Sequence, residues 1–366
     1  MKRIGFIWEK IYALDNIKAA IWFSSEKKRN HEFVMPVLED IEAHAKEVQR
    51  LLASKTYVPS PYIIKEIRDN SSGKIRVIHK PRYFPDQVIH WALMLQIQQI
   101  LMRGMYEYSC GSVPGRGPHY GRKHLRKWLD TDFRNTKYCF KLDIEKFYPS
   151  IDNEALKQSF RRSIKDPHAL WLIDTIIDSA QGLPIGNYTS QWFANFALEP
   201  LDHMIKERLR VPYYMRYVDD LVLLGPNKKK LHRTRFAIED ELNKLGLRIK
   251  DNWQVFLVNS RAIDFLGYRF YRNRTTLRRR NALRIKRRFA KIGKKGYLTL
   301  KDASAVVSYW GWMKHSDSYN FYNKHCKPIV SVGRAKGVIS KHAKIRNLRE
   351  RQAEDSSPGG AGRKAN

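Results

Sequence analysis

Two adjacent aspartates enclosed by apolar runs constrain this chain more than any other feature. Asp219 and Asp220 lie between the stretches 213–218 and 221–224, both rich in apolar residues. Burying an unpaired carboxylate in an apolar core is costly, so we expect the pair at the tip of a β-hairpin with buried strands. The two like charges repel, and a bound cation would relieve the repulsion. The alternative is an ordinary hairpin turn, because Asp is common in turns.

A third carboxylate follows another apolar stretch. Asp143 comes directly after residues 138–142 and before Ile144, a pattern typical of a buried strand that ends in an acid. On a strand next to the hairpin, it would join Asp219 and Asp220. A few carboxylates and the phosphates of the substrate can hold two Mg²⁺ ions for an in-line displacement. The pattern therefore predicts nucleotidyl transfer with two Mg²⁺ ions, for which Mn²⁺ can substitute.

The charge balance indicates a polyanionic partner. The 366 residues include 69 Lys and Arg against 36 Asp and Glu, a net charge of +33, while 43% are hydrophobic. This composition supports a folded core and disfavours an ordinary metabolic enzyme, so nucleic acid is the first partner to expect. The cysteines lie far apart and no apolar run approaches the ~18 residues of a membrane span. We expect a soluble, cytoplasmic protein with no membrane partner.

The strongest concentration of positive charge follows residue 268. Residues 269–301 contain 14 Lys or Arg and no Asp or Glu. Within them, residues 281–292 predict a helix whose apolar residues point inward and whose cations point outward; the inward set is Leu283, Ile285, Phe289 and Ile292. A charged helix face is often only solvated, but the absence of acids favours contact with phosphates.

Several motifs, in order along the chain, resemble those of a reverse transcriptase over residues 60–325. Residues 217–220 (Tyr-Val-Asp-Asp) resemble the Tyr-x-Asp-Asp box, and residues 141–148 resemble the first metal-binding box of that family. Residues 265–268 (Phe-Leu-Gly-Tyr), which we expect to form a short strand, resemble the primer grip, and 111–119 resemble the arginine-containing loop before the palm. The resemblance implies that Asp143, Asp219, Asp220 and the carbonyl of Ile144 bind metal. It also implies that Tyr148 blocks a ribose 2′-hydroxyl.

One box departs from the usual pattern and indicates a subfamily. Where most relatives have Gln-Gly-x-x-x-Ser-Pro, this chain has Ile185-Gly186-Asn187-Tyr188-Thr189-Ser190-Gln191. This box resembles that of reverse transcriptases from diversity-generating retroelements. It implies error-prone copying at template adenines of a template-repeat RNA, retrohoming into a target gene, and a basic, oligomeric accessory variability protein as partner.

The substitution also has a direct physical reading. Ile185 offers only shape where Gln offers a hydrogen bond, and losing one such contact costs about 1–3 kcal/mol. From composition alone, Ile185 is equally compatible with a place in the core. Two alternatives to the diversifying role stay open: a retron or phage-defence reverse transcriptase, and an RNA-binding scaffold without catalysis.

The remaining site residues are assigned from the resemblance and from phosphate chemistry. Residues 63–78 predict a β-hairpin with a turn at 71–73. Arg76 on this hairpin is expected to contact the triphosphate, because guanidinium binds phosphate bidentately; a solvated hairpin face is the alternative. Lys250 is a candidate proton donor to pyrophosphate. The residues expected to bind the incoming nucleotide are Lys74, Arg76, Arg82, Tyr148, Ile185, Gly186, Ser190 and Gln191. Those expected to bind primer or template are Tyr217, Phe265, Leu266, Gly267, Tyr268, Arg284, Arg287 and Arg288.

The expected fold class is α+β, a right-hand polymerase with fingers, a palm built on an antiparallel sheet backed by helices, and a helical thumb. We expect a helical N-terminal extension (1–55), fingers (56–115 and 156–187), a palm (116–155 and 188–272), a thumb (275–330) and a basic, partly disordered tail (331–366). The expected ligands are template RNA, an RNA–cDNA duplex held by its backbone and shape, and dNTPs.

Overall fold

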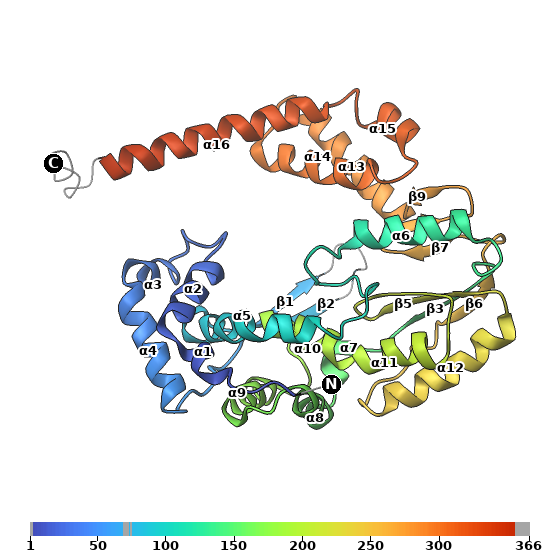
Figure 1. Ribbon diagram of the computed structural model, residues 1–366. Helices are drawn as coiled ribbons and strands as arrows, with labels where there is room; N and C mark the ends of the chain where they lie inside the picture. Colours follow the sequence, from blue (N-terminus) through green and yellow to red (C-terminus); the bar gives the residue numbers. More distant parts are fainter. Residues whose placement is uncertain (1–2, 69–72, 74, 356–366) are drawn as a thin grey trace. The chain divides into compact units, whose positions relative to one another are not determined.

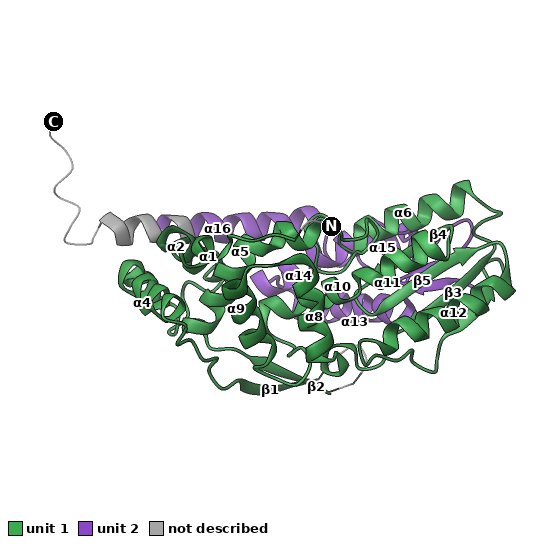
Figure 2. Ribbon diagram, turned by 60° about the horizontal axis from the view of Figure 1, so that its bottom comes forward, with its two compact units in different colours: residues 1–260 green, residues 261–366 purple. Residues whose placement is uncertain are grey.

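The chain forms two compact units. The computed structural model describes residues 3–68, 73 and 75–355, and the chain divides into unit 1, residues 1–260, and unit 2, residues 261–366 (Figure 2). Lys74, one of the residues predicted to bind nucleotide, lies outside the described residues.

Unit 1 begins with helices, as the sequence predicts for residues 1–54. These are α1 (Trp8–Tyr12), α2 (Leu14–Ser24), α3 (Met35–Glu39) and α4 (Ile41–Ala53). Both α1 and α2 pack on α5 (Val88–Met102) (Figure 1). Asp166 fixes this layer from a distant segment, because its carboxylate accepts hydrogen bonds from the backbone N–H groups of Ile7 and Trp8.

A β-hairpin and a short π-helix precede α5. Strands β1 (Ile63–Arg68) and β2 (Ile75–Lys80) pair antiparallel, which confirms the predicted hairpin. The π-helix η1 (Tyr83–Gln87) leads directly into α5. The hairpin therefore extends from the helical layer, with β2 close to the segment that follows α9 in sequence, since His79 N–H donates to the carbonyl of Ile185 at 2.8 Å.

The centre of unit 1 is a four-stranded antiparallel sheet in the order β4-β5-β3-β6. Its strands are β3 (Tyr138–Asp143), β4 (Tyr213–Tyr217), β5 (Asp220–Gly225) and β6 (Gln254–Leu257). Helix α12 (Lys228–Asn243) packs against β3, β5 and β6, and α6 (Pro118–Thr131) contacts β4. The predicted class, α+β with antiparallel sheets backed by helices, is confirmed.

Unit 1 contains further helices. They are α7 (Phe147–Ser150), α8 (Asn153–Ser163), α9 (Pro167–Ile177), α10 (Tyr188–Ala197), α11 (Glu199–His203) and the π-helix η2 (Met204–Arg208). Helix α10 packs on both α5 and α8, and most of its residues are buried. Because α10 begins at Tyr188, inside the box at 185–191, the buried helix fixes the position of that box.

Unit 2 combines a small sheet with helices. Strands β7 (Ile263–Phe265), β8 (Tyr268–Phe270) and β9 (Thr275–Leu277) are followed by α13 (Arg279–Lys295), α14 (Leu300–Met313), α15 (Tyr319–His325) and α16 (Val332–Asp355). Helix α16 occupies the first part of the predicted tail, and residues 356–366 lie outside the described part of the chain.

Two details of unit 2 differ from the sequence prediction. Residues 265–268 do not form one strand: Leu266 and Gly267 make a tight turn with φ of 53° and 80°, which joins β7 to β8. In α13, Ile285, Phe289 and Ile292 are buried as predicted, but Leu283 is 42% exposed. Leu283 precedes Ile285 by two positions, which places it about 200° away around the helix.

His90 in α5 gives unit 1 a sensitivity to acid. The side chain is buried, and burial lowers the pKa of His90 to about 4, partly offset by Asp86. Below an unfolded-state pKa of about 6.5 the unfolded chain binds a proton that the folded chain does not. Lowering the pH from 6.5 to 4 should therefore cost on the order of 3 kcal/mol of stability through this group.

Urea unfolding of the wild type and of His90→Leu between pH 6.5 and pH 4 measures the difference in stability. Exposed His31→Gln is the control, and parallel curves for wild type and His90→Leu would contradict the prediction.

Candidate active site

The three predicted carboxylates meet at one end of the central sheet. Asp143 ends β3 and Asp220 begins β5, and the two are direct partners in the antiparallel register. Asp219 is held beside them, because the N–H of Ile144 donates to the carbonyl of Asp219 at 3.0 Å. Val218 completes the turn with φ of 58°, a left-handed conformation that is strained for a β-branched residue. The strand pairing alone therefore brings Asp143, Asp219 and Asp220 together.

The electrostatics of this cluster favour a cation. Burial raises the pKa of Asp220 to about 6, against the opposing effect of Lys141, whose Nζ lies 2.9 Å from Oδ1 of Asp220. Burial and the neighbouring Asp143 raise the pKa of Asp219. Lys250 Nζ lies 3.9 Å from Oδ1 of Asp143. The carboxylates are thus crowded together, and two lysines partly balance their charge.

The donor chemistry of the cluster fits a divalent metal. Carboxylate oxygens are the ligands that Mg²⁺ prefers, usually together with substrate phosphates and water. As the side chains stand, the described residues include no ready-made group of three or more His, Cys, Asp or Glu around one point. Lys141 contacts Asp220 at the place where a cation would be expected. Asp143, Asp219 and Asp220 could hold Mg²⁺ if substrate phosphates completed the ligand set.

A pocket of 510 Å³ brings most of the predicted nucleotide-binding residues together. The predicted residues that line it are Arg76, Tyr148, Ile185, Gly186, Ser190 and Gln191. Arg82 is separate: it lines another pocket, of 310 Å³, together with Phe33 and Ile63. The pocket also contains residues outside the predicted nucleotide-binding set. Two of them, Asn187 and Tyr188, belong to the box at 185–191, and the others are Phe23, Ser24, Glu26, Lys27, Lys28, Gln87 and Trp91.

The unusual box at 185–191 is pinned to the hairpin by its backbone. Gly186 has φ of 141°, and a Cβ at this position would lie 2.2 Å from the carbonyl oxygen of His79. Only glycine permits this approach. The hydroxyl of Ser190 donates to the carbonyl of Pro184 at 2.8 Å, so it supports the box itself. The half-buried Ile185 is held at the pocket by these contacts.

Tyr148 connects the pocket with the aspartates. Burial raises the pKa of the Tyr148 phenol to about 12, and Asp219 adds to the effect. The carbonyl of Tyr148 accepts a hydrogen bond from Leu183 N–H at 2.8 Å. Gly182 has φ of 67°, and a Cβ there would lie 2.7 Å from the same carbonyl. These contacts fix the backbone of Tyr148 at the lining of the 510 Å³ pocket.

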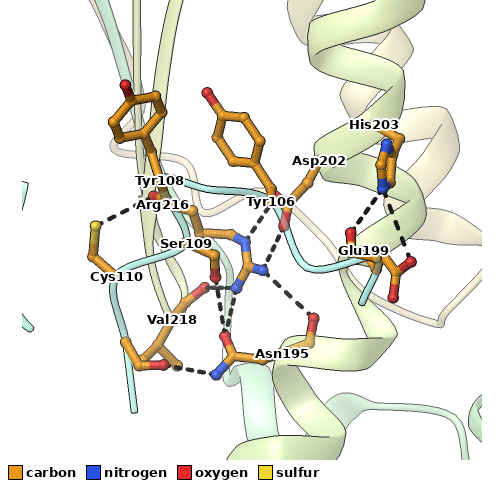
Figure 3. A network of polar contacts seen from close by, with 12 residues as sticks. Tyr106, Tyr108, Ser109, Cys110, Asn195, Glu199, Asp202, His203, Arg216 and Val218 are labelled. Atoms are coloured by element: carbon orange, nitrogen blue, oxygen red, sulfur yellow. Dashed lines mark hydrogen bonds and ion pairs between the residues drawn. The ribbon is translucent and has the colours of Figure 1, made fainter. Parts of the chain in front are cut away.

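A buried arginine supports the turn that carries the aspartates (Figure 3). Arg216 has no exposed surface; Nη2 donates to Asp202 at 2.6 Å and Nη1 donates to Asn195 at 2.9 Å. Nη1 also donates to the carbonyl of Val218 at 3.2 Å. Asn195 continues the network to the loop before α6, since its amide donates to the carbonyl of Gly111 at 2.7 Å. Sequence reasoning missed Arg216 because an arginine next to a hairpin tip is usually solvated.

The predicted primer-grip residues are part of the core of unit 2. Phe265 and Tyr268 are fully buried and Leu266 is 6% exposed. A Cβ on Gly267 would lie 2.4 Å from the ring of Trp312. The buried side chains of Phe265, Leu266 and Tyr268 are the hydrophobic anchor of the turn. Contact through the backbone of the turn stays a prediction.

The other predicted primer and template residues divide between exposed and paired groups. Arg284 and Arg287 are exposed on α13. Arg288 forms an ion pair with the buried carboxylate of Asp302 at 2.7 Å, so its role is at least partly structural. Tyr217 is half-buried at the end of β4, where it pairs with Asp220.

No helix in the described ranges has the length and apolar character that crossing a membrane requires.

Known proteins resemble this chain over the region that contains the site. The family described as "Reverse transcriptase (RNA-dependent DNA polymerase)" matches residues 67–270. The retron Ec73 reverse transcriptase of Escherichia coli is 27% identical over 206 residues, which cover 51% of this chain and 65% of that protein. The chain thus matches less than two thirds of the length of this relative.

Solved structures of two telomerases are also similar. Apo telomerase from Candida tropicalis shares 15% identity with a TM-score of 0.44, over 62% of this chain and 52% of that one. Telomerase from Candida albicans, in complex with a TWJ fragment of telomeric RNA, shares 14% identity with a TM-score of 0.46, over 61% of this chain and 46% of that one. The family match covers residues 67–270, more than half of this chain. The chain therefore belongs to the reverse transcriptase (RNA-dependent DNA polymerase) family.

Proposed function

We propose that this chain is an RNA-directed DNA polymerase whose metal ligands are Asp143, Asp219 and Asp220, with the carbonyl of Ile144 in support. The observation that carries the proposal is the register of the central sheet, which pairs Asp143 with Asp220 inside the region that matches the family. Bound Mg²⁺ would supply charge stabilisation for the attacking and leaving oxygens. Mn²⁺ has the same preference for oxygen ligands and would substitute.

The protein's own residues would position the substrates. Arg76, which lines the 510 Å³ pocket, would contact the triphosphate of the incoming dNTP, and Tyr148 would exclude a ribose 2′-hydroxyl. Lys250, 3.9 Å from Asp143, would give a proton to the departing pyrophosphate. The exposed cations of α13, among them Arg284 and Arg287, would bind the backbone of the RNA–cDNA duplex.

The subdomains follow from this function. Residues 56–115 and 156–187 would be the fingers, 116–155 and 188–272 the palm, and 275–330 the thumb. The boundary between the compact units lies after residue 260, so the last part of the proposed palm belongs to unit 2.

We further propose that the cDNA is error-prone at template adenines and serves to diversify a target gene, together with a basic accessory variability protein. Ile185 supports this role, since it stands where most relatives have Gln and lines the nucleotide pocket. Its side chain cannot donate a hydrogen bond. A retron-type role is the second candidate, favoured by the similarity to the retron Ec73 enzyme.

Restoring the polar contact should improve fidelity. In primer extension on a defined RNA template with Mg²⁺ and four dNTPs, we expect the wild type to misincorporate opposite adenine. We expect Ile185→Gln to reduce these errors about ten- to a hundredfold, the equivalent of 1–3 kcal/mol. Ile185→Val, which keeps an apolar side chain, is the matched control and should retain the errors. Accurate cDNA from the wild type would contradict the diversifying role and leave the polymerase intact.

A further inference from the structure

Three aromatic rings from distant parts of the sequence stack along one wall of the nucleotide pocket. Phe23 in α2 stacks on Trp91 in α5, with ring centres 5.9 Å apart and planes 14° apart. Trp91 in turn stacks on Tyr188 at the start of α10, at 4.2 Å and 7°. Phe23 is 46% exposed, and all three residues line the pocket. The row of parallel rings therefore ends in a ring that a further planar group can reach.

More exposed aromatics lie nearby in sequence and are accompanied by cations. Trp22 is 51% exposed and carries the guanidinium of Arg29 at 3.7 Å above its ring. Phe33 is 44% exposed and has Lys80 Nζ at 4.5 Å. Exposed apolar side chains that form a contiguous patch often mark a binding site, whereas single exposed ones are common and need no explanation. Trp22 directly precedes Phe23 in α2, and Phe33 lines the separate 310 Å³ pocket, so both add exposed aromatic surface outside the nucleotide pocket.

The same wall is positively charged. Lys27 and Lys28 line the pocket along with one acid, Glu26. The described hydrogen-bond partner of Lys28 is neutral: its Nζ donates to Oε1 of Gln87 at 2.7 Å. Burial and the proximity of Lys80 lower the pKa of Lys28. A half-buried cation in these surroundings is suited to a phosphate.

Parallel aromatic faces combined with cations are the features that bind single-stranded nucleic acid, because each base offers a face for stacking and each phosphate a charge. The contacts proposed above for the incoming nucleotide use Arg76, Tyr148 and Ile185, which are other residues of the same lining. A templating base must pair with that nucleotide, so the unpaired template strand must pass close to the same pocket. The aromatic wall is the part of the lining that is left for it.

We propose that the aromatic wall, defined as Phe23, Trp91, Tyr188 and Lys28, binds the single-stranded RNA template next to the templating base. Phe23 stacks on the first unpaired base and Lys28 contacts its phosphate. This inference rests on the proposed polymerase function but concerns binding, which is measured without chemistry.

The test uses the full chain with a DNA primer annealed to an RNA template that carries 2-aminopurine at the first unpaired position. Stacking on Phe23 should quench the fluorescence of this base on binding. Phe23→Ala should remove the quench and weaken binding of single-stranded RNA about five- to a hundredfold. Phe23→Leu should behave in the same way, since it keeps apolar bulk but has no aromatic face. Phe23 is exposed, so both variants should fold, which thermal unfolding checks.

The matched control is Phe236→Ala on α12. Phe236 is 57% exposed and also lies under an arginine, Arg235, at 4.3 Å. Binding and quench should be unchanged in this variant and in Asp219→Asn. If cDNA synthesis fails but the Phe23-dependent quench is present, the wall is supported and the polymerase proposal is not.

Three results would overturn the inference. The first is tight binding of RNA by the wild type without quenching of the 2-aminopurine fluorescence. The second is a loss of RNA affinity in Phe236→Ala equal to that in Phe23→Ala. The third is a raised KM for dNTP in Phe23→Ala with RNA affinity unchanged, which would assign the stack to the incoming nucleotide.

Discussion

Asp219→Asn is expected to abolish DNA synthesis while leaving the protein folded. The substitution keeps the shape of the side chain but removes a charge that metal ions need as a ligand. Losing several kcal/mol of charge stabilisation in the transition state should slow primer extension by about 10³-fold or more. Single-turnover primer extension on an RNA template measures the loss.

The thermal stability of Asp219→Asn distinguishes the loss of a metal ligand from misfolding. Burial and Asp143 raise the pKa of Asp219, so the ionised carboxylate is disfavoured in the folded chain above its unfolded pKa. At pH 8 and without metal, Asp219→Asn should therefore melt at the same temperature as the wild type or higher. Asp240→Asn, an exposed aspartate on α12, should change neither property. Full DNA synthesis by Asp219→Asn would contradict the assignment of Asp219 as a metal ligand.

The aspartate cluster could be predicted because each part of it has a local signature. Apolar stretches that end in acids indicate buried strands with carboxylates at their ends. Antiparallel pairing then fixes which ends meet, and the observed partners Asp143 and Asp220 are those that the pattern favours. The same reasoning found the hairpin of β1 and β2 and the helices of residues 1–54.

Tertiary features without a local signature could not be predicted. The rings of Phe23, Trp91 and Tyr188 lie on three separate helices, and nothing near each residue indicates that they stack. Residues 265–268 look like a strand because they are apolar, yet the positive φ values of Leu266 and Gly267 make a turn. Arg288 was assigned to nucleic acid with its neighbours, since the sequence gives no sign that Asp302 from the next helix pairs with it.

The buried arginine is the second case where a large effect is expected. Arg216 and Asp202 are both fully buried and form a charge-assisted pair with Nε–Oδ1 of 2.9 Å and Nη2–Oδ2 of 2.6 Å. Arg216→Met leaves the carboxylate of Asp202 buried with the hydroxyl of Tyr214 as its described partner. Breaking a buried pair on one side costs about 3–5 kcal/mol. We expect the free energy of unfolding of unit 1 to fall by this amount, as measured by urea unfolding of the full chain.

The double variant Arg216→Met/Asp202→Leu distinguishes stability from positioning. Replacing both charges with apolar groups should recover most of the lost stability, because no charge is left buried without a partner. Primer extension should stay at least about tenfold below wild type, since the Val218 carbonyl has lost the donor that holds the strained turn beside Asp219. The control is Arg161→Met, whose partly exposed ion pair with Asp174 should contribute about 1 kcal/mol or less. If the double variant regains full activity together with stability, Arg216 serves the fold alone and the turn holds the aspartates without it.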